Sequence, residues 1–190
     1  MSAAPLLRLE DVACRRGGRL LFEGLDLSLG PGEAALVTGP NGVGKSSLIR
    51  LAAGLLRPAA GRVERNASLA LADEAPALDP KLTVGRALAF WARLDGADPA
   101  PGLDAFGLAP LAGVPVRMLS TGQRKRAVLA RVVAGGAPLW LLDEPVSGLD
   151  AEGQARLAAA MAAHLAGGGA ILAATHQPIG LDAAREVRLG

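Results

Sequence analysis

A glycine-rich stretch near the N-terminus has the composition of a phosphate-binding loop. Residues 39–46 read GPNGVGKS and match the pattern G-x-x-x-x-G-K-[ST]. Glycines at these positions let successive backbone N–H groups turn inward around a phosphate chain, while Lys45 can reach the outer phosphates and the Ser46 hydroxyl can ligate Mg²⁺. An apolar run precedes the stretch and a helical pattern follows it, which distinguishes it from a chance glycine-rich turn. We therefore predict a phosphate site here.

Two carboxylates end a second apolar run, LWLLDE. Asp143 can hold the hydration shell of Mg²⁺, and Glu144 can orient and polarise an attacking water. An acidic strand end is ordinary by itself, so the phosphate loop upstream is what favours a catalytic role. His176 follows a third run, AILAA, and could bond the terminal phosphate and the same water. His164 lies in an alanine-rich helical pattern and is interpreted as structural.

The stretch LSTGQRKRAVLARVV, residues 119–133, begins with small polar residues and continues with basic ones. Ser120 and Gln123 form a capping-box pattern, so one interpretation is a well-capped helix with a solvated basic face. The residues of that face are Arg124, Lys125, Arg126 and Arg131. Exposed N–H groups at a capped start that contains Gly122 are also an anion site. The second interpretation is therefore another contact with nucleotide phosphates.

These polar stretches need elements that bring them to one edge of a sheet. Unalternating apolar runs at 34–38, 138–142 and 170–174 predict strands buried on both faces. Helical patterns occupy about 45–56, 122–134 and 152–165. Strands that alternate with helices predict an α/β fold with a mostly parallel sheet flanked by helices. Ligands bind such sheets at the carboxyl ends of the strands, where all three polar endings should meet.

Two regions are expected to differ from this core. Short strand patterns at 6–14, 19–29, 61–65 and 67–72 predict an N-terminal antiparallel β subdomain. Residues from about 78 to 134 predict a small inserted helical subdomain, with one helix around 84–94, within a single domain spanning 1–190. Phe90 and Trp91 in that helix either dock a membrane subunit or belong to the subdomain core.

Composition excludes several classes of protein. A chain of 190 residues, 51% apolar and 20% charged, fits one globular domain and argues against disorder. Twenty basic residues against eighteen acidic ones leave a net charge of +2, so we expect no nucleic-acid partner. The single Cys14 excludes an internal disulfide and a Cys-based zinc site. No signal-peptide core or bilayer-spanning stretch is expected.

Five motifs, in this order, resemble those of the ATP-binding subunits of ABC transporters. GPNGVGKSS resembles their phosphate loop, LSTGQ their signature LSGGQ, LWLLDEP their magnesium and catalytic-base strand, SGLD their D-loop, and ATH their switch histidine. The resemblance covers nearly the whole chain and implies a P-loop NTPase of ABC ATPase architecture. It implies that Glu144 and His176 are catalytic, and that Ser46 and Asp143 hold Mg²⁺. The implied ATP-binding residues are Gly39, Pro40, Asn41, Gly42, Val43, Gly44, Lys45, Ser46 and Ser47.

The resemblance also implies partners. Two subunits would form a head-to-tail homodimer with ATP at the interface, where Ser120, Gly122 and Gln123 of one copy contact the nucleotide held by the other. ATP hydrolysis would then drive transmembrane permease subunits. Within the family, GRLLFEGLDLSLGPGE, LTVGRALAFWARLDG and THQP are most similar to the ATP-binding subunits of haem exporters in cytochrome c biogenesis. That likeness implies haem-exporter-type membrane partners and peripheral attachment at the cytoplasmic face of the bacterial inner membrane.

Other functions remain as alternatives. The chain could serve another small bacterial ABC transporter or be a non-transport ABC ATPase, although it lacks the long insertions or basic arms of the latter. A GTPase would need an N-K-x-D motif, which is missing, and a kinase would not explain LSTGQ. A nucleotide sensor would bind ATP without turnover.

Three positions depart from the family pattern. Thr121 replaces a glycine of the signature. Arg16 falls near the place of an aromatic residue that stacks on adenine, and a guanidinium can also stack on a base. The glutamine expected before the helical subdomain is missing, with Asp73, Glu74 or Ala75 near its place, and Glu74 could touch the magnesium shell.

Overall fold

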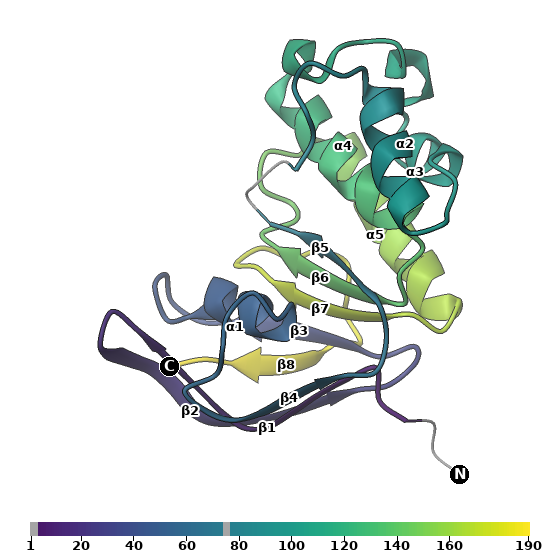
Figure 1. Ribbon diagram of the computed structural model, residues 1–190. Coiled ribbons are helices and arrows are strands. Elements are labelled where there is room, and N and C mark those ends of the chain that lie inside the picture. Colours follow the sequence, from purple (N-terminus) through teal and green to yellow (C-terminus); the bar gives the residue numbers. More distant parts are fainter. Residues whose placement is uncertain (1–3, 74–76) are drawn as a thin grey trace.

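The computed structural model describes residues 4–73 and 77–190, which form two sheets and a separate group of helices. In Figure 1 the smaller sheet and the helical group lie at opposite ends of the molecule, with the larger sheet between them. Within the described residues, no helix has both the length and the apolar character needed to cross a bilayer.

The smaller sheet is antiparallel, as predicted. Its strands are β1 (Leu7–Arg16), β2 (Arg19–Leu29) and β4 (Ala60–Arg65), in the order β2-β1-β4. Gly17 and Gly18 join β1 to β2 with φ values of 53° and 80°, as in the turns that fit the twist of a hairpin. Leu7 and Leu9 are buried and the intervening Arg8 is exposed, so this part of β1 turns one face to the core.

The larger sheet is parallel. Its strands are β5 (Leu69–Ala72), β6 (Leu139–Asp143), β7 (Ala170–Ala174), β3 (Ala34–Thr38) and β8 (Arg185–Arg188), in the order β5-β6-β7-β3-β8. Every residue of β6 and β7 is buried, which confirms the interpretation of the unalternating apolar runs.

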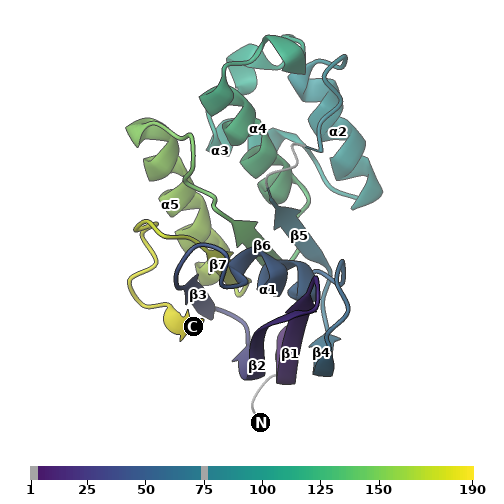
Figure 2. The same cartoon turned by 90° about the vertical axis from the view of Figure 1, so that its left-hand side faces the viewer.

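Alternate side chains of β6 enter two different cores. Leu139 and Leu141 pack with α1 (Lys45–Ala52) and the antiparallel sheet. Trp140 and Leu142 pack with α4 (Thr121–Ala134) and α5 (Ala151–Ala166) on the other side. Figure 2 shows α1 between the two sheets, where it closes the first of these cores.

Two strands differ from the expectation. The 67–72 pattern predicts a strand of the antiparallel subdomain, but β5 joins the parallel sheet beside β6. The physical reason is that both faces of β5 are apolar, with Leu69 and Leu71 against one core and Ala70 and Ala72 against the other. The edge strand β8 was not predicted, because REVR is short and mostly charged.

The helical group follows β5 in the chain. It contains α2 (Val84–Leu94), α3 (Ala100–Ala105), the short 3-10 helices η1 (Ala109–Leu111) and η2 (Val116–Met118), and α4. The helix expected around 84–94 is α2, which Thr83 caps by accepting a hydrogen bond from the N–H of Arg86. The extent of an inserted subdomain, about 78–134, stays a prediction.

The position of β3 in the sheet matters for the site. Its two neighbours, β7 and β8, both come from the last part of the chain. The N–H of Leu189, just after β8, donates to the carbonyl of Thr38 at 3.0 Å. The C-terminal residues therefore lie directly beside the segment that follows β3.

Candidate nucleotide site

The predicted phosphate loop connects β3 to α1. Gly39 and Gly44 have φ values of 135° and 119°, a region that residues with side chains rarely adopt. A Cβ atom at Gly39 would also collide with the carbonyl of Leu189, and one at Gly44 would approach the Phe22 ring to 3.1 Å. Backbone conformation favours glycine at both positions, and packing also excludes a side chain at Gly39.

Lys45 is the first residue of α1 and is only 8% exposed. Its Nζ donates to the carbonyl oxygens of Gly39 at 2.9 Å and Pro40 at 3.2 Å. The ammonium therefore lies within the turn of the loop, where it can meet the oxygens of a phosphate chain. The N-terminus of α1 adds its positive dipole end at the same place.

The loop and Glu144 face one cavity of about 480 Å³. Its lining residues are Arg16, Leu21, Asn41, Gly42, Gly44, Lys45, Ser46, Ser47 and Glu144. Most of the predicted loop residues are thus brought together with the predicted base in a cavity of a size typical for small-molecule ligands. Leu21 was not foreseen, because a leucine in a strand pattern carries no functional signal.

Glu144 has an unusual backbone. Its φ is 45°, a left-handed conformation that costs a residue with a side chain about 1–2 kcal/mol. Its N–H donates to the carbonyl of Ala174 at 2.8 Å, in register with the pairing of β6 and β7. Its carboxylate lies 3.0 Å from Nδ1 of His176. The sheet therefore brings the two predicted catalytic side chains into contact.

His176 also borders the phosphate loop. With Thr38 and Gly39 it lines a second cavity, next to the end of β3. An imidazole that contacts the carboxylate and lies beside the loop can act on a terminal phosphate and on a water between them. The catalytic role of His176 stays a prediction.

Oxygen donors suited to a hard divalent cation are present. Asp143 ends β6 and is 3% exposed, and Ser46 lines the nucleotide cavity. A hydroxyl and a carboxylate are the ligand types that Mg²⁺ takes alongside water and phosphate oxygens. The donor chemistry of the two residues therefore fits the predicted metal.

The signature residues lie at the start of α4, outside the lining of the nucleotide cavity. Ser120 caps α4: its Oγ accepts from the N–H of Gln123 at 3.2 Å, and its own N–H donates to the Gln123 side chain at 3.0 Å. This confirms the predicted capping box. Ser120 is exposed, and Gly122 lies against the carbonyl of Gly148 in the SGLD segment. None of the three signature residues is part of the lining of their own chain's nucleotide cavity.

The expectation of a solvated basic face on α4 is wrong for three of its residues. Arg124 is half-buried and donates to the carbonyl of Leu119 at 3.2 Å. Lys125 is half-buried, and its Nζ donates to the carbonyl of Glu144 at 2.9 Å. Arg131 donates to the carbonyl of Leu71 and lies 4.9 Å from the centre of the Trp91 ring. Burial lowers the pKa of Arg131 from its ordinary value, partly offset by two nearby carboxylates. The contacts of Lys125 and Arg131 join residues far apart in sequence, so no local pattern could reveal them.

The structure describes most of the positions that depart from the family pattern. Arg16 lines the nucleotide cavity, and Thr121 is exposed at the first position of α4. Of the three candidates for the missing glutamine, Asp73 directly follows β5. Glu74 and Ala75 lie outside the described residues.

Comparison with known proteins gives consistent matches. The sequence profile of the ABC transporter family matches residues 22–147. The chain is similar to the cytochrome c biogenesis ATP-binding export protein CcmA of Sphingopyxis alaskensis, with 57% identity over 188 residues and 97% of each chain covered. The protein of the same name from Novosphingobium aromaticivorans is 55% identical over 179 residues, which cover 94% of this chain and 93% of that one.

A solved structure described as the ATP-binding subunit of an ABC transporter superposes with a TM-score of 0.87 and 25% identity, covering 97% of this chain and 85% of that chain. The family profile includes the phosphate loop, the signature and the β6 carboxylates. Sequence, fold and cavity therefore agree. The chain belongs to the family of ABC transporter ATP-binding proteins.

Proposed function

We propose that this ABC ATPase hydrolyses ATP to drive an exporter of cytochrome c biogenesis, and that haem is the cargo. The process is inferred from the two relatives named cytochrome c biogenesis ATP-binding export protein, at 57% and 55% identity. The proposal that ATP is hydrolysed depends on one observation of the site: Glu144, which can act as a base, lines the same cavity as the phosphate loop.

Each part of the cavity has a separate task. The loop N–H groups bind the phosphates, and Lys45 offsets the negative charge of the outer ones. Ser46 and Asp143 would hold Mg²⁺, which when bound neutralises charge on the phosphate oxygens. Glu144 orients the attacking water, and His176, 3.0 Å from its carboxylate, keeps that carboxylate beside the loop. The Arg16 guanidinium would stack on the adenine base.

A second copy of the chain would complete each site. Ser120, Gly122 and Gln123 lie at the start of α4, where Ser120 is exposed, yet none of the three lines the cavity of its own chain. A helix N-terminus can bind the phosphates of a nucleotide held by another molecule. This supports a head-to-tail homodimer with two shared ATP sites.

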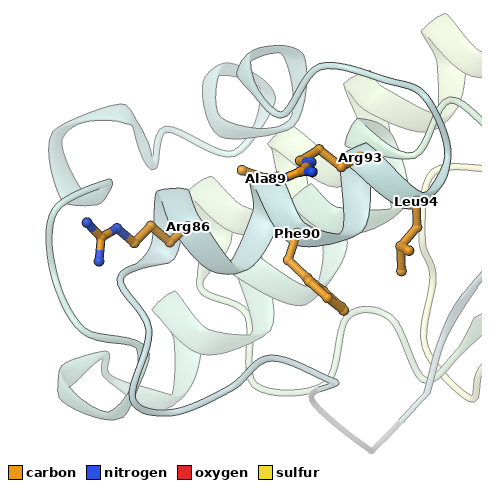
Figure 3. Close-up of a pocket in the computed structure, with 5 residues that line it drawn as sticks. All are labelled: Arg86, Ala89, Phe90, Arg93 and Leu94. Atoms are coloured by element: carbon orange, nitrogen blue, oxygen red, sulfur yellow. The ribbon is translucent and has the colours of Figure 1, made fainter.

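The surface of α2 would dock the transmembrane permease subunits. Phe90 and Leu94 are 54% and 65% exposed, and Figure 3 shows them projecting from the same side of α2. With Arg86, Ala89 and Arg93 they line an open pocket of about 480 Å³. Trp91 instead packs against the core, and its Nε1 donates to the carbonyl of Ala77 at 2.7 Å. The two adjacent aromatic residues thus have different roles.

The place of action follows from these partners. A protein attached to haem-exporter-type permease subunits would lie at the cytoplasmic face of the bacterial inner membrane and be held there peripherally. The site chemistry supports this, because ATP is supplied on the cytoplasmic side.

Replacing Glu144 by Gln tests the proposed reaction. Glu144→Gln keeps the shape of the side chain but removes the base, so ATP turnover should fall by at least about 100-fold while ATP affinity is retained. Size-exclusion chromatography with ATP and Mg²⁺ should then show a trapped dimer. In cells, this variant as sole copy should stop the assembly of c-type cytochromes.

The control is the wild-type chain in the same assays. Turnover equal to wild type in Glu144→Gln would refute the catalytic role. A monomer with ATP and Mg²⁺ bound would refute the shared sites, and normal c-type cytochromes in cells would refute the assigned process.

A further inference from the structure

Three main-chain contacts surround the proposed general base. Glu144 holds a left-handed backbone with φ of 45°. Its N–H donates to Ala174 at the end of β7, and its carbonyl accepts from the N–H of Ser147 at 3.3 Å and from Nζ of Lys125 at 2.9 Å. The first two contacts come from the sheet and from the following turn. The third comes from α4, which belongs to the helical group.

The Lys125 contact is strong by its chemistry. An ammonium that donates to a carbonyl forms a charge-assisted hydrogen bond, and partial burial of the lysine reduces competition from water. Because a left-handed backbone is unfavourable for glutamate, its surroundings must hold it in place. A cationic donor on the carbonyl of that same residue contributes directly.

We propose that Lys125 is a positioning residue for Glu144: it fixes the backbone from which the carboxylate reaches the cavity, and it makes that position depend on where α4 lies. The proposal rests on the proposed function, in which Glu144 orients the attacking water. Lys125 is absent from the lining of the nucleotide cavity, so it acts through Glu144 and not on the nucleotide.

This contact has a consequence for the dimer. α4 begins just after the Ser120 cap, and we propose that this end of the helix contacts a nucleotide on the second copy. The same helix carries Lys125, which bonds the carbonyl of Glu144, the proposed general base of the site in the same copy. A shift of α4 as its N-terminus binds or releases phosphate would therefore move Glu144. Displacements of about 1 Å can change a rate by about 100-fold, so one lysine can link the two sites.

Lys125→Met provides the test, because it removes the ammonium and keeps an unbranched apolar stem. We expect kcat for ATP to fall by about 10-fold or more, with KM and ATP affinity unchanged, since positioning affects only the reacting water. Lys125→Arg should recover most of the loss by donating to the same carbonyl. The matched control is Lys81→Met, the same chemical change at an exposed lysine, which should leave kcat unchanged.

A double-mutant cycle separates positioning from a merely structural role. If Lys125 acts through Glu144, Lys125→Met should cause no further loss when added to Glu144→Gln. Unchanged kcat in Lys125→Met, a parallel loss of ATP affinity, failure of arginine to rescue, or an equal further loss in the Glu144→Gln background would each overturn the proposal. Wild-type protein without ATP turnover would instead overturn the proposed function, and this proposal with it.

Discussion

Main-chain atoms of different elements hold the residues of the nucleotide site in place. Carbonyls of the loop accept hydrogen bonds from the Lys45 side chain, and the end of β7 accepts one from the backbone N–H of Glu144. The loop, Glu144 and His176 could be predicted because their chemistry is written in short contiguous motifs. Lys125 and Arg131 could not, because each bonds a carbonyl on another element, and any residue type offers a carbonyl.

His164, interpreted from sequence as structural, has a defined packing role. Its ring stacks on Trp140 with centroids 3.8 Å apart and 11° between the planes. It fills space that a Cβ atom at position 169 would need, which explains Gly169 in the turn between α5 and β7. Burial lowers the pKa of His164, although backbone hydrogen bonds partly oppose this.

Acid should therefore destabilise the fold through His164. The folded chain binds the proton less readily than the unfolded chain, so this contribution to stability is complete above the ordinary histidine pKa of 6.5 and declines below it. His164→Phe keeps a ring on Trp140 and should weaken the dependence. Urea denaturation between pH about 7.5 and about 5.5 would measure it. An unchanged pH dependence of the free energy of unfolding in His164→Phe would contradict the assignment.

Helices were predictable where a helical period dominates the sequence, and buried strands where a short apolar run does not alternate. The bounds of α2 agree with the expected 84–94, since apolar periodicity and the Thr83 cap mark the same helix. Placement of β5 failed because pairing partners are not encoded in a strand four residues long. Close contacts between helices could not be predicted from the sequence either. For example, a Cβ atom at Gly102 in α3 would collide with the carbonyl of Ala130 in α4.

At the scale of an element, the proposed docking surface of α2 can be tested apart from catalysis. Phe90→Ala with Leu94→Ala should reduce co-purification with the membrane subunits by about 10-fold or more, because buried apolar anchors contribute strongly to interfaces. Both side chains are exposed, so the free energy of unfolding and the basal ATP turnover should change little.

Leu20→Ala is the matched control, since Leu20 is an exposed leucine on β2 that is outside the α2 pocket. It should leave co-purification at the wild-type level. Full partner recovery with the folded Phe90→Ala, Leu94→Ala protein would contradict docking at α2.

For the whole molecule, one copy of the chain holds two separated halves of the proposed ATP sites. The loop and Glu144 line the cavity at the sheet edge, whereas the Ser120 cap lies in the helical group, outside that lining. This separation predicts complementation between two inactive variants. Lys45→Ala disables the loop, and Ser120→Asp places a negative charge against phosphate while aspartate still caps the helix.

Each variant alone should show little ATP turnover. A mixture should regain activity, up to about one quarter of wild type when copies pair at random, because half of the dimers are mixed and each contains one intact site. Phosphate release across mixing ratios would measure this, with wild type mixed with Lys45→Ala as reference. No recovery, despite dimers in the mixture, would contradict sites shared between copies.

The neighbours of β3 determine when, during synthesis, the sheet around this strand can be completed. The strand that carries the phosphate loop lies between β7 and β8, which follow the other strands of both sheets in the sequence. Chains emerge from the ribosome N-terminus first, and pairings between distant residues form late. The Thr38 carbonyl obtains the Leu189 N–H only after β7 and β8 have been translated. A nascent chain thus carries its phosphate-loop motif long before the strand in front of it has its two neighbours, so the sheet edge that holds the loop is completed late in folding.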